Sequence, residues 1–270
     1  HFHADFVSGH IDLARKTGAE IVYGPTAQPA FEATIVTDNQ EFKVGDLTIR
    51  VLHTPGHTPE SVTYLLIDAD GKEQAIFTGD TLFLGDVGRP DLAQKLNDEL
   101  TQEKLAGMLF DSLRTRIMPL ADDILVYPAH GAGSACGKNM SSDTVDTLGN
   151  QKATNYALRA DMTKEEFIKE VTTGILPPPQ YFPKNVIMNK MGYDSIDEVI
   201  TRGTTALDLA AFKGEVENGA LILDVRSQAE FIKGFIPNAL FIGLNGQFAM
   251  WVGAIIEDIK QRIVLIVPEG

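Results

Sequence analysis

The residues best suited to chemistry are histidines and carboxylates that recur in short segments of the first half of the chain. They are His1, His3, Asp5, His57, Asp80 and His130. A single histidine is usually a hydrogen-bonded surface or core residue, but four of the six histidines fall in these segments. Imidazoles and carboxylates are donors that proteins offer to divalent transition metals. The ordered set therefore predicts a metal site.

Regular elements are predicted to hold these residues in place. Strands are expected at 46–53, 74–80 and 123–130, from period-two alternation or short apolar runs. Each leads into a chemically active segment, and groups at strand ends are held rigidly. His57 lies in a loop with a proline on either side, and alternate side chains in His1-Phe-His3-Ala-Asp5 can converge on one point.

Two further predictions concern the same half of the chain. Residues 62–68 are expected to pair with 74–80 in a hairpin that turns at Asp70-Gly71. The segment 18–24 predicts a short buried strand between two glycines. Strands alternating with polar turns and helices indicate an α/β fold.

The second half begins with a change of composition. A capping box at Thr163 predicts a helix that stops at Gly174, and Pro177–Pro179 with Pro183 predict a stiff, exposed connector. Ser195 is expected to cap another helix. Buried strands are predicted at 221–226 and 263–267. We therefore expect a domain boundary near 185–195.

Composition limits the classes of function. The 270 residues carry a net charge of −14, which repels phosphate backbones and makes nucleic acid an unfavourable partner. No apolar run reaches the roughly 18 residues that span a bilayer, so no membrane association is expected. The single cysteine, Cys136, allows no intrachain disulfide and favours a reducing compartment, here taken as the cytoplasm. A homo-oligomer stays open.

The order H-x-H-x-D, P-G-H-T-P, T-G-D and P-A-H over about residues 1–150 resembles the metallo-β-lactamase superfamily. The resemblance implies an α/β fold, an αββα sandwich with the metal at one edge, here over 1–185. The strands that normally precede the first motif are absent, so we expect one sheet to lack its opening strands. Phe6 stands where the superfamily has a histidine for a second metal. A phenyl ring cannot ligate, and a single metal is favoured.

Three other segments resemble persulfide dioxygenases, which oxidise a low-molecular-weight thiol persulfide with O₂ to sulfite and free thiol. These segments are 4–9, 85–91 and 128–137. The resemblance implies one Fe(II) per chain, held by His1, His57 and Asp80. It makes His3, Asp5 and His130 catalytic groups that orient the ligands and line the cavity. With zinc as the alternative metal, His3 and His130 would ligate instead. The implied role is sulfide detoxification.

Two residues have a substrate role by the same resemblance. Arg89, on a glycine-flanked loop after Asp80, would hold the carboxylate of the thiol substrate. A structural pair with Asp91 or Asp86 is the alternative. Cys136 would accept sulfur near the metal, and a small buried thiol in a tight turn is the alternative.

Residues 195–270 resemble the first half of a rhodanese domain, through Leu223-Asp-Val-Arg226, Glu230-Phe231 and Gly234-Phe-Ile-Pro-Asn-Ala239. Rhodaneses carry sulfur on a cysteine in the loop after the next buried strand, and backbone N–H groups stabilise the persulfide anion. Val267 occupies that position, and Pro268 removes one N–H. We expect a catalytically silent, truncated rhodanese-like α/β domain.

Three functions follow. The leading hypothesis is a non-haem Fe(II) persulfide dioxygenase, whose partners are a thiol persulfide and O₂. The second is a metal-dependent thioester hydrolase of the glyoxalase II kind, against which Phe6 argues. The third is a sulfur-binding or assembly surface on the rhodanese-like domain, which is compatible with the first.

Overall fold

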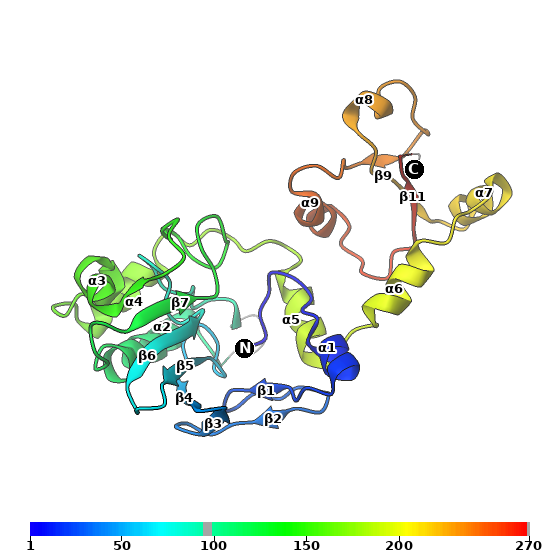
Figure 1. The fold of residues 1–270 in the computed structure, drawn as a ribbon. Coiled ribbons are helices and arrows are strands. Elements are labelled where there is room, and N and C mark those ends of the chain that lie inside the picture. The colour runs from blue at the N-terminus through cyan, green and yellow to red at the C-terminus, as the bar shows by residue number, and fades with distance from the viewer. Residues whose placement is uncertain (94–98, 269–270) are drawn as a thin grey trace. The chain divides into compact units, whose positions relative to one another are not determined.

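The structure is a computed structural model, and it describes residues 1–93 and 99–268. The chain divides into two compact units (Figure 1). The first holds His1–Pro178 and Phe182–Tyr193, and the second holds Pro179–Tyr181 and Asp194–Gly270. Among the described residues, none of the helices combines the length and apolarity that crossing a bilayer requires.

The first unit alternates helices and strands, which matches the α/β class expected from the sequence. Its early elements are α1 (His10–Thr17), β1 (Val22–Tyr23), β2 (Thr34–Ile35), β3 (Glu41–Val44), β4 (Leu47–His53), β5 (Val62–Ile67) and β6 (Glu73–Gly79). Its later elements are α2 (Gln102–Ser112), the π-helical turn η2 (Leu113–Ile117), β7 (Leu125–Pro128), β8 (Asp146–Thr147), α3 (Leu148–Thr154), the 3₁₀ turn η3 (Tyr156–Leu158), α4 (Lys164–Thr172) and α5 (Phe182–Met191).

Six of the described strands form one sheet in the order β3-β4-β5-β6-β7-β8. Neighbours run antiparallel except β6 and β7, which are parallel. The predicted hairpin is confirmed, because β5 and β6 pair antiparallel. In its turn the Asp68 carboxylate accepts the backbone N–H groups of Asp70 and Lys72. Gly71 takes the positive φ of 83° that this turn requires. Since β6 and β7 are parallel, Asp80 and His130 follow at the same edge of the sheet.

The core lies on one face of this sheet, under α2, α3 and α4 (Figure 1). Alternation along β5 buries every second side chain, as a strand with one covered face requires. The core side chains from strands and helices include Leu52, Leu65, Ile76, Val126, Leu109, Leu148 and Phe167. On the other face Phe77 and Tyr127 stack at 5.4 Å and stay partly exposed. The separate parallel pair of β1 and β2 is the other described sheet of this unit.

Three local predictions are corrected by the structure. The strand expected at 18–24 is only the two residues of β1, because Gly18 still caps α1 in a left-handed conformation. Pro183 belongs to the first turn of α5, where its missing N–H costs no helical hydrogen bond. Ser195 precedes a helix, but its side chain makes no capping hydrogen bond. The capping box at Thr163 is confirmed.

The second unit is a smaller α/β body. Its elements are α6 (Ile196–Gly203), α7 (Leu209–Glu217), β9 (Leu221–Asp224), α8 (Gln228–Phe231), β10 (Leu240–Phe241), α9 (Phe248–Ile255) and β11 (Ile263–Ile266). The described strands form a parallel sheet in the order β10-β9-β11. Successive side chains of β9 point to opposite faces, so Ile222 packs towards α7 and Leu223 towards α9. Both strands predicted here are present, although each ends before the predicted residue and β11 buries Val264 while leaving Ile263 and Leu265 exposed.

Candidate metal centre

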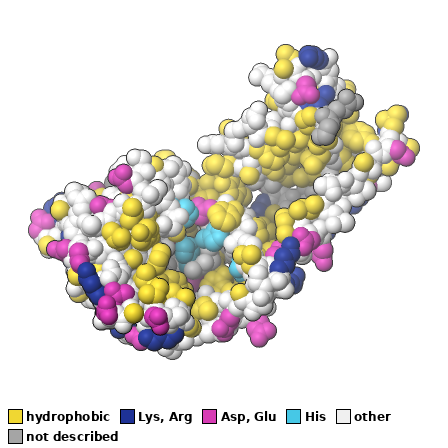
Figure 2. Space-filling model, viewed as in Figure 1, with side chains coloured by type: hydrophobic (Ala, Val, Ile, Leu, Met, Phe, Trp, Pro, Cys, Tyr) yellow, Lys and Arg dark blue, Asp and Glu magenta, His cyan; other side chains and the backbone are white. Residues whose placement is uncertain are grey.

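One cluster of donors forms where the loop after β4, the end of β6 and the start of the chain meet. It contains His1, His57 and Asp80, with one ligand atom of each within 4.8 Å of the others. The Asp80 Oδ2 lies 3.4 Å from His57 Nε2 and 3.8 Å from His1 Nε2. Histidine side chains gather visibly at this surface of the first unit (Figure 2).

The donor atoms of this cluster fit a cation. His57 and Asp80 are almost fully buried, and among the described residues His1 Nε2 and Asp80 Oδ2 have no hydrogen-bond partner. A buried polar atom without a partner is costly, and it is unusual unless an ion or water satisfies it. Two imidazoles and one carboxylate aimed at one point suit a divalent metal such as Fe(II) or Zn²⁺. The residues present therefore fit the metal that the sequence predicted.

Backbone contacts orient His57 towards this cluster. Its Nδ1 lies 2.8 Å from the carbonyl oxygen of Arg89, which turns Nε2 towards Asp80. The loop before it is tight, because a Cβ on Gly56 would lie 2.4 Å from the backbone of Leu109 in α2. The Ser112 hydroxyl donates to the carbonyl of Pro55 and fixes the loop on α2.

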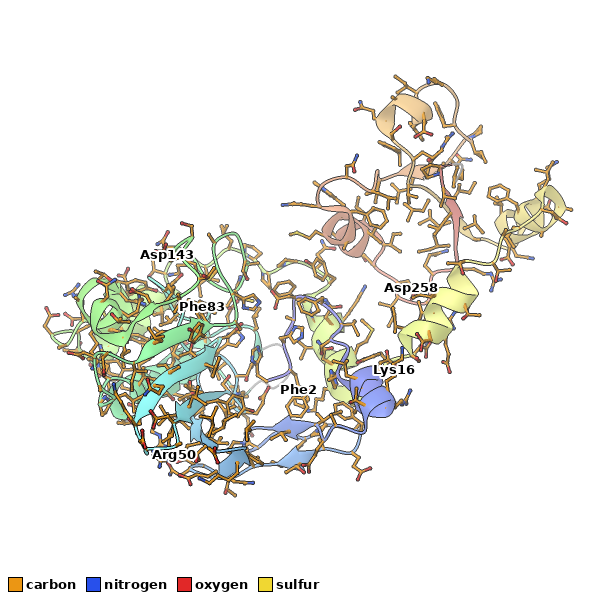
Figure 3. All side chains as sticks on the ribbon, in the orientation of Figure 1. Phe2, Lys16, Arg50, Phe83, Asp143 and Asp258 are labelled. Atoms are coloured by element: carbon orange, nitrogen blue, oxygen red, sulfur yellow. The ribbon has the colours of Figure 1, made fainter. Side chains whose placement is uncertain are left out.

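A second cluster lies beside the first and contains Asp5, His130 and Cys136. His130 connects the two clusters: its Nδ1 lies 2.9 Å from Asp80 Oδ1 and its Nε2 lies 3.3 Å from Asp5 Oδ2. Phe83, labelled in Figure 3, packs edge-on against the His130 ring at 5.8 Å. His3 Nδ1 is 3.7 Å from the same Asp5 oxygen. Asp5, His130 and His3 thus lie next to the first cluster.

The two carboxylates set the charge of His130. Burial by itself would lower the pKa of its imidazole, but the contacts with Asp5 and Asp80 outweigh burial and raise the pKa to about 10. The same contacts change the pKa of Asp5. Burial opposes ionisation of the Asp5 carboxyl, yet the hydrogen bonds with His130 and His3 hold the pKa of Asp5 well below its usual range. The two carboxylates therefore favour the protonated form of His130.

Cys136 is a buried thiol. Its side chain is 1% exposed, and its Sγ lies 3.3 Å from Asp5 Oδ1. Burial, followed by the nearby charges of Asp80 and Asp5, raises the pKa of the thiol far above its usual value. In the absence of a metal, Cys136 is consequently protonated and a poor nucleophile. The geometry matches the small buried thiol that the sequence offered as the alternative to a sulfur acceptor.

Arg89 makes the structural pair that the sequence left open. Its Nε and Nη2 donate to the two carboxylate oxygens of Asp91 at 2.7 and 2.8 Å. Its guanidinium also donates to the carbonyls of Ala135 and Leu176, and the side chain is 7% exposed. Asp86 contacts other groups. With these hydrogen bonds the Arg89 guanidinium connects neighbouring loops. The substrate-binding role of Arg89 stays a prediction, and this geometry does not favour it.

We expect Arg89→Met to lower the free energy of unfolding by about 3 kcal/mol, because it leaves the Asp91 carboxylate largely buried without its cation. The double variant Arg89→Met/Asp91→Asn should recover part of this loss. Denaturant unfolding of the three proteins measures both effects. A raised KM at unchanged stability would instead support the substrate role and refute the structural one.

The sequence analysis missed residues that hold the metal-binding segments. On α5, Asn185 donates to the carbonyl of Ala4, and Asn189 donates to the carbonyls of His3 and Phe6. These two amides lie four residues apart and therefore on one helix face. The Glu60 carboxylate accepts the N–H of Phe2. An N-x-x-x-N pair in a helix was the available signal, but its partner could not be read from the sequence.

Asp86, which the sequence offered as a possible partner of Arg89, instead supports the loops around the site. It is 1% exposed, accepts the hydroxyl of Tyr156 at 2.8 Å and accepts the N–H groups of Val87, Lys138 and Asn139. These contacts tie the loop after Asp80 to the loop after His130. Both metal-site loops are thereby fastened to each other.

Phe6 contributes no donor to either cluster. Its side chain is 61% exposed, and its ring centroid lies 4.5 Å from that of His3. The place that a second-site histidine would take is thus a surface position.

Two family models match the chain. The metallo-β-lactamase superfamily matches residues 1–130, and the rhodanese-like domain matches residues 208–270. A crystal structure of a metallo-β-lactamase from Staphylococcus aureus subsp. aureus COL is 30% identical, with a TM-score of 0.79. The match covers 98% of this chain and 75% of that protein.

Two named activities recur among the curated relatives. The mitochondrial persulfide dioxygenase ETHE1 of Homo sapiens is 30% identical over 182 residues, which are 67% of this chain and 62% of that protein. The hydroxyacylglutathione hydrolase of Brucella anthropi is 37% identical over 134 residues, 48% of this chain and 45% of that protein. The chain spans between 45% and 67% of the first relatives compared. These matches leave the reaction open.

Proposed function

The chain belongs to the metallo-β-lactamase superfamily and carries a C-terminal rhodanese-like domain, and from this premise we propose that its first unit is a persulfide dioxygenase. In this proposal one Fe(II) per chain is held by His1, His57 and Asp80. The substrates are a low-molecular-weight thiol persulfide and O₂. With one water they give the free thiol and sulfite.

The observation that carries the proposal is the composition of the first cluster. Two imidazoles and one carboxylate converge, and Phe6 offers no donor for a second ion of the hydrolase kind. Such a set leaves coordination positions open and is the ligand type of non-haem Fe(II) oxygenases. Similarity to ETHE1 persulfide dioxygenase over two thirds of the chain supports the same choice.

The residues of the chain have distinct tasks in this reaction. Fe(II), when bound, supplies the redox chemistry that activates O₂ towards the persulfide sulfur. The Arg89 carbonyl orients His57, and His130 orients the Asp80 carboxylate through Oδ1, leaving Oδ2 for the metal. Asp5 keeps a proton available on His130 beside the site. His3 and Asp5 lie beside the site, in contact with each other and, through Asp5, with His130.

The test is metal analysis of anaerobically purified protein, combined with O₂ uptake and sulfite release in the presence of a thiol persulfide. We expect about one iron per chain and one sulfite per O₂ consumed, as the reaction requires. Tightly bound zinc with no O₂ consumption would overturn the proposal.

A glyoxalase II-like hydrolase is the second candidate, because hydroxyacylglutathione hydrolases are as prominent among the relatives as persulfide dioxygenases. Such hydrolysis suits two zinc ions that share a water. The zinc-loaded protein should be assayed with a hydroxyacylglutathione. Turnover of that thioester that rises with the second equivalent of zinc would favour this candidate over the dioxygenase.

We expect the rhodanese-like domain to be silent in sulfur transfer. The sulfur-carrying position after β11 is Val267, which has no nucleophile, and Pro268 lacks the N–H that would stabilise a persulfide anion. Thiosulfate and cyanide should give thiocyanate at no more than the rate in buffer. Thiocyanate formation that survives Cys136→Ser would contradict this expectation.

A further inference from the structure

The segment before α1 carries donors of the site, yet residues 1–9 lie outside every helix and strand. Its side chains alternate. Phe2 and Ala4 are buried, whereas His1 and Asp5 each contribute a donor to one of the two clusters. Buried backbone groups that have no partner in a helix or a sheet must find one elsewhere. The shape of this segment is therefore fixed by contacts from other parts of the chain.

Asn189 on α5 makes four hydrogen bonds to this segment. Its Nδ2 donates to the carbonyl oxygens of His3 and Phe6, each at 2.9 Å. Its Oδ1 accepts the N–H of Ser8 at 2.9 Å and the Ser8 hydroxyl at 3.0 Å. The Asn189 side chain is 1% exposed. One buried carboxamide thus uses both of its N–H donors and its acceptor on a single turn of the chain.

The helix that presents this carboxamide is held in place by further hydrogen bonds. One turn before Asn189, the Asn185 side chain donates to the carbonyl of Ala4 at 2.9 Å. The N–H of Ala30 donates to the carbonyl of Lys190, and the N–H of Ile11 donates to the Tyr193 hydroxyl. A shift of α5 along the segment would break these bonds, so Asn189 acts from a fixed position.

Contacts continue from this turn to the metal-binding cluster. The turn carries Asp5, whose Oδ2 lies 3.3 Å from His130 Nε2. His130 Nδ1 lies 2.9 Å from Asp80 Oδ1. A displacement of the turn moves the Asp5 carboxylate, and His130 must then either follow it or lose a contact. The position of the turn is thereby transmitted to the Asp80 carboxylate.

We propose that Asn189 is a positioning residue of the metal centre, which fixes the shape of residues 3–8 and through them the orientation of Asp80. It acts on the backbone of the segment and supplies no ligand. Removal of a group that supports a metal ligand lowers metal affinity by roughly 10–100-fold. The inference rests on the metal centre of the proposed function, but not on the reaction, because it applies to any divalent ion held by His1, His57 and Asp80.

The test uses the full chain loaded with Co²⁺ under anaerobic conditions, because the visible absorption of protein-bound Co²⁺ depends on the geometry of its ligands. Asn189→Leu keeps a side chain of similar size but removes all four hydrogen bonds. We expect Co²⁺ to bind about tenfold or more weakly, with visible bands changed in position or intensity. Asn185→Leu removes one bond to the segment and should have a smaller effect.

Val171→Ala is the matched control for a general loss of stability. Val171 lies on α4 and is buried in the core of the first unit. Its truncation should lower the denaturant midpoint and leave Co²⁺ affinity and absorption unchanged. A folded Asn189→Leu protein with the Co²⁺ affinity and absorption of the unmutated chain would overturn the proposal. An equal change in Val171→Ala would overturn it as well, since lost stability would then explain the effect.

The outcome stays distinct from that of the dioxygenase proposal, because Co²⁺ binding is read without O₂ or persulfide. A chain that shows the expected Co²⁺ changes but consumes no O₂ refutes the dioxygenase alone. A chain that binds no Co²⁺ refutes the metal centre and this role of Asn189 together. If circular dichroism shows that Asn189→Leu does not fold, Asn185→Leu and Ser8→Ala decide the test, and unchanged Co²⁺ affinity in both overturns the proposal.

Discussion

The Asp80→Asn protein is expected to bind iron more than ~100-fold more weakly than the unmutated chain, and to form no measurable sulfite from a thiol persulfide. Loss of a group that only supports a ligand already costs ~10–100-fold in metal affinity, and Asp80 is placed as a ligand itself. Its carboxylate is fully buried and faces both His57 and His1. Asparagine keeps the size of the side chain but removes the negative charge that balances the cation.

Metal content after dialysis against a weak chelator, together with O₂ uptake, measures this effect. Asp143→Asn is the control, because that carboxylate, labelled in Figure 3, is exposed and accepts a hydrogen bond from Ser141 of its own loop. The assignment of Asp80 fails if the variant retains one iron per chain at unchanged affinity.

The Gly88→Ala variant is expected to lose both stability and metal affinity, although Gly88 carries no donor. A Cβ at this position would lie 1.9 Å from the carbonyl oxygen of Asp80 and 3.1 Å from Cγ of His57. The first neighbour is backbone and cannot swing away, so the end of β6 must move. Overpacking of this kind lowers the free energy of unfolding by about 1–3 kcal/mol. Here it would also move Asp80 and His57, two donors of the metal site, apart.

Gly131→Ala is the matched control, because a Cβ there meets nothing within 4 Å on the loop after His130. Denaturant unfolding and metal titration of both variants decide the result. We expect Gly131→Ala to stay close to the unmutated protein in both measurements. An unchanged metal affinity in Gly88→Ala would show that the loop relaxes without moving Asp80 or His57.

Much of the local structure followed from short stretches of sequence. The hairpin at Asp70-Gly71 and the capping box at Thr163 were predicted because each is decided within a few residues. Where the outcome depended on distant packing, prediction was weaker. Pro183 was assigned to a connector, yet it opens α5, whose Asn189 binds carbonyls of the first loop more than 180 residues away in sequence.

By itself, the sequence determined which metal-donor side chains this protein has and which strand ends carry them, because residue type and strand periodicity are local properties. The resemblance to persulfide dioxygenases already implied the set of His1, His57 and Asp80, and the tertiary structure decided that Cys136 lies with Asp5 and His130. It also decided that Arg89 pairs with Asp91. These outcomes depend on contacts between segments distant in the chain, where burial and hydrogen bonding select one partner among several of the same chemistry.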